Sequence, residues 1–289
     1  MHFRSICYLL FAYSSVFGIV SGHQRGGYGR IDAGTRTDNS FDLPVDNKTC
    51  TYKGHQLQIK RALKDLEEIV EIGLNILYTS PTSNVVSKYF GHINHGAELI
   101  TPIGILTRLQ KGTKKNIVLH CGTKNDDTEN NGILTDDWTV CSSSKRFTSE
   151  GGFVEQINGA GGDGDGRKPT KQISIIVCPQ SFVPSTHRSY LEDICQNDFT
   201  LNDNVPTLYW PISLLSLFMQ VPQLSSPLMQ IDKRDYANVL DLANRNPEMA
   251  KHNIYTYLYF LLDVYARKYY SPNGCTGQPS GRVYEEPWN

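Results

Sequence analysis

The sequence lacks the short motifs that identify most hydrolases and metalloproteins. Its 289 residues contain no H-E-x-x-H, no C-x-x-C and no G-x-S-x-G. The first motif would place two zinc ligands and a general base on one helix face. The second is a common spacing of cysteine zinc ligands, and the third is the nucleophile turn of the α/β-hydrolases. Without them, neither a cysteine zinc cluster nor serine catalysis is indicated.

The sequence also has no large excess of positive or negative charge. There are 28 Lys and Arg residues against 29 Asp and Glu residues, for a formal net charge of −1. Proteins that bind nucleic acid carry clustered basic residues, often interleaved with aromatic ones, and no such patch occurs here. We therefore expect no nucleic-acid partner. No stretch beyond the N-terminal leader is apolar enough to predict a membrane span.

Residues 1–22 have the pattern of a secretory signal peptide. Arg4 precedes an apolar run that extends to Val20, and compact residues lead up to Gly22, after which cleavage is expected. The run is short and is broken by Ser14 and Ser15, which favours a cleaved leader over a membrane anchor. The sequence thus predicts a secreted, extracellular protein.

The cysteines are consistent with an oxidising compartment. Cys7 lies in the predicted leader, so six of the seven cysteines remain in the mature chain. An even number in a secreted chain predicts three disulfides, for which fifteen pairings exist. Local spacing favours the pairs Cys121–Cys141 and Cys178–Cys195, which leaves Cys50 to pair with Cys275. Asn47-Lys48-Thr49 is the single N-glycosylation sequon and predicts a glycan on Asn47.

Composition divides the rest of the chain into a folded domain and two tails. Residues 23–50 are polar and rich in Gly, Asp, Arg and Thr, which predicts a disordered tail. We expect the domain to span residues 51–276 and a second tail to follow at 277–289.

Hydrophobic periodicity predicts the elements of this domain. Apolar residues recurring at three and four predict a long helix from Gln56 to before Pro81. Thr101 is expected to cap a third helix, with Pro102 in its first turn. Further helices are predicted over 83–90, 232–244 and 247–270, and strands over 116–120 and 172–177.

Several short segments occur in an order that resembles a known family. They are Lys88-Tyr89-Phe90-Gly91, His120-Cys121, Val177-Cys178-Pro179, Asp235-Tyr236-Ala237 and the run from Asn253 to Phe260. In this order they are similar to segments of the deuterolysin-like (aspzincin) metallopeptidases, which include fungal branches, over about residues 57–270. The resemblance implies a zincin-like α+β domain that is mostly helical, with a small antiparallel or mixed sheet and stabilising disulfides.

The chain departs from this family at the catalytic positions. Where the family has T-L-x-H-E-x-x-H, the sequence from Thr207 onward reads T-L-Y-W-P-I-S-L. Trp210 and Leu214 stand in place of the two histidine ligands, and Pro211 stands in place of the glutamate that activates water. By the same resemblance, Asp235 is a vestige of the third ligand. The resemblance therefore implies no catalytic residue and no metal at this site.

The function expected from these features is binding without catalysis. The chain would be a secreted, inactive metallopeptidase homologue, a pseudoenzyme or effector-like protein, whose partner is an extracellular protein, peptide or glycan. The residues expected to line its binding cleft are Trp210, Leu214, Asp235, Tyr236 and Tyr257.

Two alternatives stay open from the sequence. One is an active zinc metalloendopeptidase with displaced ligands, drawn from His92, His95 or His252 together with Asp235. His92 and His95 lie between glycines, which favours a polar loop over a ligand-bearing helix. The other alternative is a structural extracellular protein without a ligand cleft.

Overall fold

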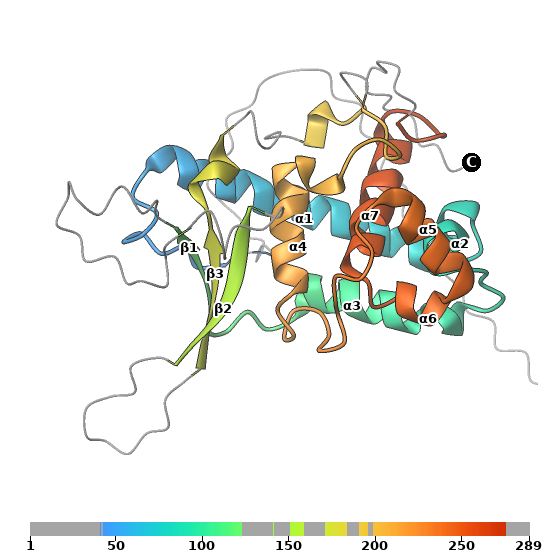
Figure 1. Cartoon of the computed structure of the whole chain (residues 1–289), viewed down its shortest axis with the longest axis horizontal. Helices are drawn as coiled ribbons and strands as arrows, with labels where there is room; N and C mark the ends of the chain where they lie inside the picture. Colours follow the sequence, from blue (N-terminus) through green and yellow to red (C-terminus); the bar gives the residue numbers. More distant parts are fainter. Residues whose placement is uncertain are drawn as a thin grey trace, which may run out of the picture. The chain divides into compact units, whose positions relative to one another are not determined.

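The computed structural model describes residues 41, 43–122, 141, 151–158, 171–183, 191–195 and 199–275. Within these residues the domain is α+β and mostly helical, with a small mixed sheet, as expected (Figure 1). The helices are α1 (Lys53–Thr79), α2 (Asn84–Phe90), α3 (Ile100–Lys111), α4 (Trp210–Met219), α5 (Tyr236–Arg245), α6 (Pro247–Ala250) and α7 (Ile254–Tyr269). Short 3-10 turns lie at η1 (Gly96–Leu99), η4 (Pro179–Phe182), η5 (Leu191–Asp193) and η6 (Pro206–Leu208).

The sheet has three strands in the order β1-β3-β2, namely β1 (Ile117–Cys121), β3 (Lys171–Val177) and β2 (Gly152–Asn158). β1 runs parallel to β3, and β2 runs antiparallel to it. The two predicted strands are confirmed as β1 and β3. β2 was not predicted, because its sequence G-F-V-E-Q-I-N alternates too weakly to stand out from the loops around it.

The domain begins earlier than expected. Phe41 and Leu43 are buried, and a parallel bridge joins Val45 to Leu119 of β1. The Asp46 N–H donates to the Leu119 carbonyl at 2.8 Å. Residues 43–50 therefore belong to the folded domain and correct the predicted tail of residues 23–50. The rest of that tail, the leader and residues 277–289 lie outside the described residues.

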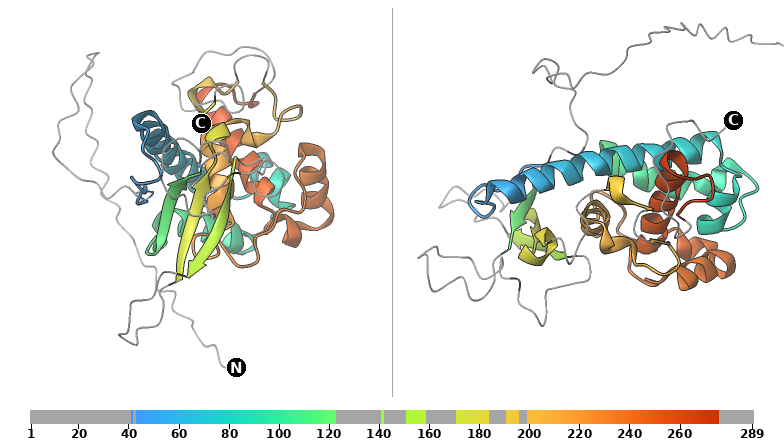
Figure 2. Two further views of the ribbon diagram at one scale, coloured as in Figure 1. Left: turned by 60° about the vertical axis from the view of Figure 1, so that its left-hand side comes forward. Right: turned by 90° about the horizontal axis from the view of Figure 1, so that it is seen from above.

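Helices α1 and α7 are the central helices of the hydrophobic core. α7 is buried from Ile254 to Ala266, so it is a core helix rather than a surface one. α1 packs against it, and Gly73 permits the close approach: a β-carbon there would lie 2.3 Å from Leu261 Cδ2. Figure 2 shows α1 running past both the sheet and the group of helices that includes α7. No helix among the described residues combines the length and apolarity that a membrane crossing requires.

Several helix boundaries differ from the prediction, and α5 begins at Tyr236 rather than at residue 232. Thr101 lies inside the first turn of α3 rather than capping it, because η1 leads directly into the helix and Leu99 is the N-cap. The helix predicted over 247–270 is split into α6 and α7. Asn253 leaves helical geometry there to pair with Gln230 in a parallel bridge.

The three disulfides pair differently from the prediction. They join Cys50 to Cys121, Cys141 to Cys178 and Cys195 to Cys275, so all three expected pairs are wrong. Local spacing failed because the sheet decides which cysteines meet. The segment before Cys50 pairs along β1, which brings Cys50 beside Cys121 at the end of that strand. The number of disulfides is as predicted.

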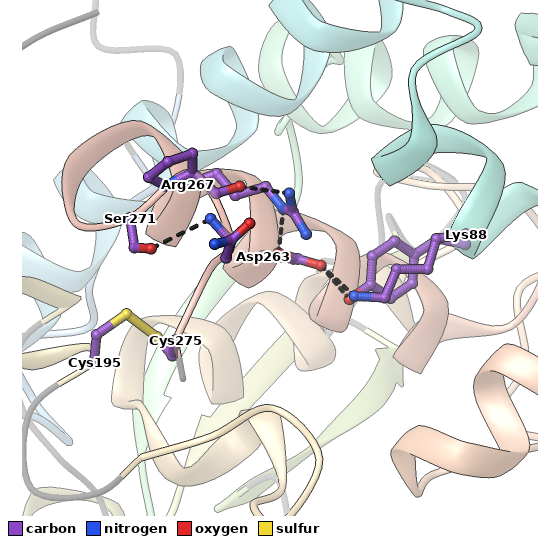
Figure 3. A network of polar contacts seen from close by, with 9 residues as sticks. Lys88, Cys195, Asp263, Arg267, Ser271 and Cys275 are labelled. Atoms are coloured by element: carbon purple, nitrogen blue, oxygen red, sulfur yellow. Dashed lines mark hydrogen bonds and ion pairs between the residues drawn. A yellow bond between two sulfur atoms is a disulfide. The ribbon is translucent and has the colours of Figure 1, made fainter. Parts of the chain in front are cut away.

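One buried carboxylate ties several elements together (Figure 3). Asp263 of α7 is 1% exposed and accepts from Lys88 Nζ at 2.7 Å and from the Tyr89 hydroxyl at 2.9 Å. Its other oxygen accepts from Arg267 Nε at 2.7 Å, and Arg267 also donates to the Pro272 carbonyl. α2, α7 and the turn after α7 therefore share one charge cluster.

We expect Asp263→Asn to lower the free energy of unfolding by about 3 kcal/mol, because it leaves two cations that were paired with a buried charge. Denaturant unfolding followed by circular dichroism measures this. Asp241→Asn is the matched control, because the Arg245–Asp241 pair on α5 is exposed and should contribute less than about 1 kcal/mol. Equal effects of the two substitutions would contradict a central role for Asp263.

Candidate functional site

Helix α4 carries the positions where the family resemblance places zinc ligands. All ten of its residues are buried, and Trp210 and Leu214 are 1% and 0% exposed. Pro211 lies in the first turn, where a missing N–H is tolerated. α4 packs against α1, α7 and β2, so the ligand positions are filled by the apolar core.

A row of aromatic rings runs from Trp210 to the surface. The Trp210 and Phe182 ring centroids are 5.7 Å apart in an edge-on arrangement. Phe182 stacks on His55 at 3.9 Å, and His55 meets Tyr52 edge-on at 4.9 Å. Exposure rises along the row, from 1% at Trp210 and 8% at Phe182 to 66% at Tyr52. We call these four residues the aromatic row.

The aromatic row was not predicted from the sequence. Its members come from the start of α1, from η4 and from α4, so no local pattern connects them. Burial lowers the pKa of His55, whose ring stacks on Phe182. The aromatic row is a cluster of packed rings beside α4 and is not a set of metal ligands.

The five residues expected to line a cleft do not lie on one surface. Trp210, Leu214 and Tyr257 are in the core, and the Tyr257 hydroxyl donates to the Lys251 carbonyl at 2.6 Å. A side chain without exposed surface cannot contact a partner, so this expectation is corrected for these three residues. Asp235 is exposed and Tyr236 is half-buried, so only these two remain accessible.

Asp235 has a structural role that accounts for its position. It is the N-cap of α5, and its carboxylate accepts from the Asn238 N–H at 3.0 Å and from Asn238 Nδ2 at 2.6 Å. These hydrogen bonds, the side-chain one first, hold its pKa below the usual value. Aspartate is a preferred N-cap residue, but the helix predicted over 232–244 placed Asp235 inside the helix and missed this role.

The segment that leads into α5 is exposed but firmly held. Asp232, Lys233, Arg234 and Asp235 are all exposed. Beneath them the buried Asn253 accepts the N–H groups of residues 232 and 233 at 3.1 and 3.3 Å and donates to the Lys233 carbonyl at 3.1 Å. The Tyr259 hydroxyl donates to the Arg234 carbonyl at 3.2 Å. We call residues 232–236 the charged segment.

The residues present do not fit a zinc ion. Within the described ranges, no three His, Cys, Asp or Glu side chains are grouped so that they could share a metal. His92 and His95 are exposed on the loop before η1, and His252 Nδ1 lies 2.9 Å from the Glu248 carbonyl. The alternative ligand set with Asp235 is therefore not assembled in this structure.

Three carboxylates do lie near one another on a different face. Asp65 and Glu68 are on α1, Glu192 is in η5, and the Tyr269 hydroxyl donates to Glu68. Burial, followed by the charges of Glu68 and Glu192, raises the pKa of Asp65 to about 6. The group lies where α1 meets η5.

A small groove lies at the start of the domain. Its volume is about 230 Å³, below the roughly 300 Å³ at which small-molecule sites begin. It is lined by Leu43, Pro44, Val45, Asn47, Gln56, Lys60 and Leu63. Its size gives no support for a drug-sized ligand, but its rim includes the sequon asparagine.

Comparison with protein families matches residues 158–278 to the family described as "HRXXH: Putative peptidase family". This match agrees with the resemblance to peptidases that the sequence suggested. Neither H-R-x-x-H nor H-E-x-x-H occurs in the chain. The one His-Arg pair, His187-Arg188, has Leu191 where a second histidine would stand, and the pair itself lies outside the described residues.

Three curated fungal proteins are similar to most of the chain. The pH-regulated antigen PRA1 of Candida albicans is 25% identical over 84% of this chain and 69% of its own. Antigen 1 of Emericella nidulans is 25% identical over 77% and 68%, and protein ZPS1 of Saccharomyces cerevisiae is 24% identical over 81% and 80%. Among solved structures, a zinc peptidase from Grifola frondosa aligns with 12% identity and a TM-score of 0.44, over 73% of this chain and 95% of that one.

We expect Asp65→Asn to raise the free energy of unfolding at pH 7 to 8, with the gain shrinking as the pH falls from about 6 to about 4. The native pKa of about 6 lies above the usual 3.8, so native Asp65 binds protons more readily than the unfolded chain does. The wild type therefore gains stability on acidification, whereas the asparagine variant does not.

Urea unfolding at several pH values measures this difference. Glu71→Gln, an exposed carboxylate on the same helix, is the control and should leave the pH dependence unchanged. A gain for Asp65→Asn that is constant from pH 4 to pH 8 would contradict the assignment.

Proposed function

We propose that the protein is a secreted, catalytically inactive relative of the HRXXH peptidases that acts by binding, a proposal supported by the similarity of residues 158–278 to that family. The observation that carries this proposal is the burial of the ligand positions. Trp210 and Leu214 lie in the core of α4, where neither a metal nor a substrate carbonyl has room.

The chemistry of the site supports the absence of catalysis. Hydrolysis by a zinc peptidase requires three protein ligands and a base that takes a proton from the attacking water. The indole of Trp210, the ring of Pro211 and the side chain of Leu214 supply neither function. Asp235 is engaged in capping α5.

The secretory route is supported by the leader pattern at residues 1–22 and by the three disulfides, which persist in oxidising compartments. The names of two relatives, which describe them as antigens, agree with an extracellular location for those proteins. We propose the same location for this chain.

The charged segment is the surface that best suits a partner. It presents four consecutive charged side chains on a backbone that Asn253 and Tyr259 hold in place. A loop fixed from below loses little conformational entropy when a partner binds. Tyr236, a half-buried aromatic residue, follows these charges directly in the chain. We propose that an extracellular protein, peptide or glycan binds here.

We expect the purified protein to retain less than about 0.1 equivalent of zinc after dialysis against a trace of the metal, because true zinc sites hold it tightly. Metal content by mass spectrometry checks this. Hydrolysis of a denatured protein substrate should stay at the blank rate with or without 1,10-phenanthroline, and an active deuterolysin-type peptidase is the positive control. One tightly held equivalent and chelator-sensitive hydrolysis would instead establish the displaced-ligand enzyme.

We expect the double substitution Lys233→Glu and Arg234→Glu to weaken partner binding at least tenfold, equivalent to about 1.4 kcal/mol. The protein would be immobilised and challenged with extracellular fluid, and bound components would be quantified by mass spectrometry.

Arg245→Glu is the matched control, because Arg245 is an exposed cation at the opposite end of α5. Unchanged retention by the double variant would exclude the charged segment as the contact surface. Retention at the blank level by the wild type would favour the structural alternative.

A further inference from the structure

The sequon Asn47-Lys48-Thr49 lies in a closed turn rather than on an open loop. The Cys50 N–H donates to the Asp46 carbonyl at 2.8 Å, which closes one helical turn around the sequon. The Lys48 N–H donates to Asp46 Oδ1 at 2.9 Å. Asp46 thus fixes the backbone on both sides of Asn47.

The threonine hydroxyl of the sequon is fully engaged. Thr49 Oγ1 lies 3.3 Å from both the carbonyl oxygen and Oδ2 of Asp46, to which it donates. It also accepts from the Cys121 N–H at 3.3 Å, and the residue is half-buried. Asn47 itself is exposed, and its Oδ1 accepts from Gln56 Nε2 at 3.4 Å.

The turn is fastened to the sheet by a covalent bond and by backbone pairing. Cys50 forms a disulfide with Cys121 at the end of β1. The Asp46 N–H donates to the Leu119 carbonyl, and the Leu119 N–H donates to the Pro44 carbonyl at 2.9 Å. Once these contacts exist, the sequon cannot extend without breaking the edge of the sheet.

N-glycosylation requires a conformation of this segment that differs from the closed turn. In the transfer, the bond between the anomeric carbon of a lipid-pyrophosphate-linked oligosaccharide and its phosphate oxygen breaks. A new bond joins that carbon to Asn47 Nδ2, which loses one proton, and the lipid pyrophosphate leaves. The transferase binds the acceptor in an extended form and recognises the threonine hydroxyl, so the closed turn withholds both features.

We propose that Asn47 is an N-glycan acceptor that is modified only before the turn at residues 46–50 and the Cys50–Cys121 disulfide close. The inference depends on the secretory route of the proposed function. The side chain of Asn47 can carry the glycan afterwards, because it is exposed at the rim of the groove.

The order of synthesis provides the necessary interval. Cys121 follows Cys50 by 71 residues, so the sequon is complete well before its partner cysteine exists. At about 5 to 20 residues per second, this separation corresponds to roughly 4 to 14 s. The fraction of chains that carry a glycan on Asn47 is therefore set by competition between oligosaccharide transfer and closure of the turn.

The test compares folded and unfolded full-length acceptors. The chain without residues 1–22 is made in a host that lacks the transferase, oxidised and folded. One sample is kept folded, and another is reduced and denatured before dilution. Both are incubated with solubilised transferase and a lipid-linked oligosaccharide donor. We expect the unfolded sample to gain one oligosaccharide, removed by peptide N-glycosidase, and the folded sample to gain at least tenfold less.

Two variants test the identity of the acceptor residue and the role of the closed turn. Asn47→Gln should gain no oligosaccharide in either state. Asp46→Ala keeps the disulfide but loses the side-chain contacts to Lys48 and Thr49, and should raise transfer to the oxidised protein. Equal transfer to folded and unfolded wild type would overturn the proposed order. No transfer to the unfolded chain would overturn the acceptor assignment.

A parallel translation into microsomes separates this inference from the proposed function. The chain is translated once with its own residues 1–22 and once with a standard leader. Glycosylation with the standard leader alone would support the acceptor assignment while contradicting the secretory route. Absence of the glycan with both leaders would overturn the acceptor assignment.

Discussion

The carboxylate of Asp263 is the constraint on which the arrangement of the helices depends. It is the one acidic group in the buried stretch of α7, where an uncompensated charge would cost several kcal/mol. Compensation requires Lys88 and Tyr89 to reach in from α2 and Arg267 to fold back along α7. Gly274 lies so near that a β-carbon there would approach Asp263 Oδ1 to 2.9 Å, and its φ of +75° suits glycine. Two helices and the turn to Cys275 are thereby fixed by one charge.

Much of the fold could be predicted because it follows local patterns. Local sequence patterns were enough to predict three features of the fold. They are the apolar repeat of α1, the end of α2 at Gly91 and the β-branched runs of β1 and β3. What failed depends on contacts between distant residues. The pairing of Cys50 with Cys121 follows from the bridge between Val45 and Leu119, and the break before α7 follows from the pairing of Asn253 with Gln230. Neither contact has a local signature.

In the candidate site, too, the chemistry of single residues could be predicted, whereas contacts between distant residues could not. The sequence predicted that the ligand positions of the resembling family cannot bind zinc here, because side-chain chemistry excludes Trp210 and Leu214 as ligands. It could not decide whether Trp210 lines a cleft or fills the core, because a tryptophan suits both environments. Its contact with Phe182, and through it the stack on His55, places it in the core. The exposed surface is found instead at the charged segment, whose support by Asn253 is a tertiary feature.

An apolar α4 changes what the domain needs in order to fold. Histidine ligands and a glutamate at these positions would leave buried polar groups that only a bound metal could satisfy, which couples stability to metal supply. Trp210, Pro211 and Leu214 remove that requirement and add apolar surface to the core instead. A domain that folds without zinc can act wherever zinc is scarce. The proposed binding function would then use surface segments such as residues 232–236, whose backbone Asn253 and Tyr259 hold in place.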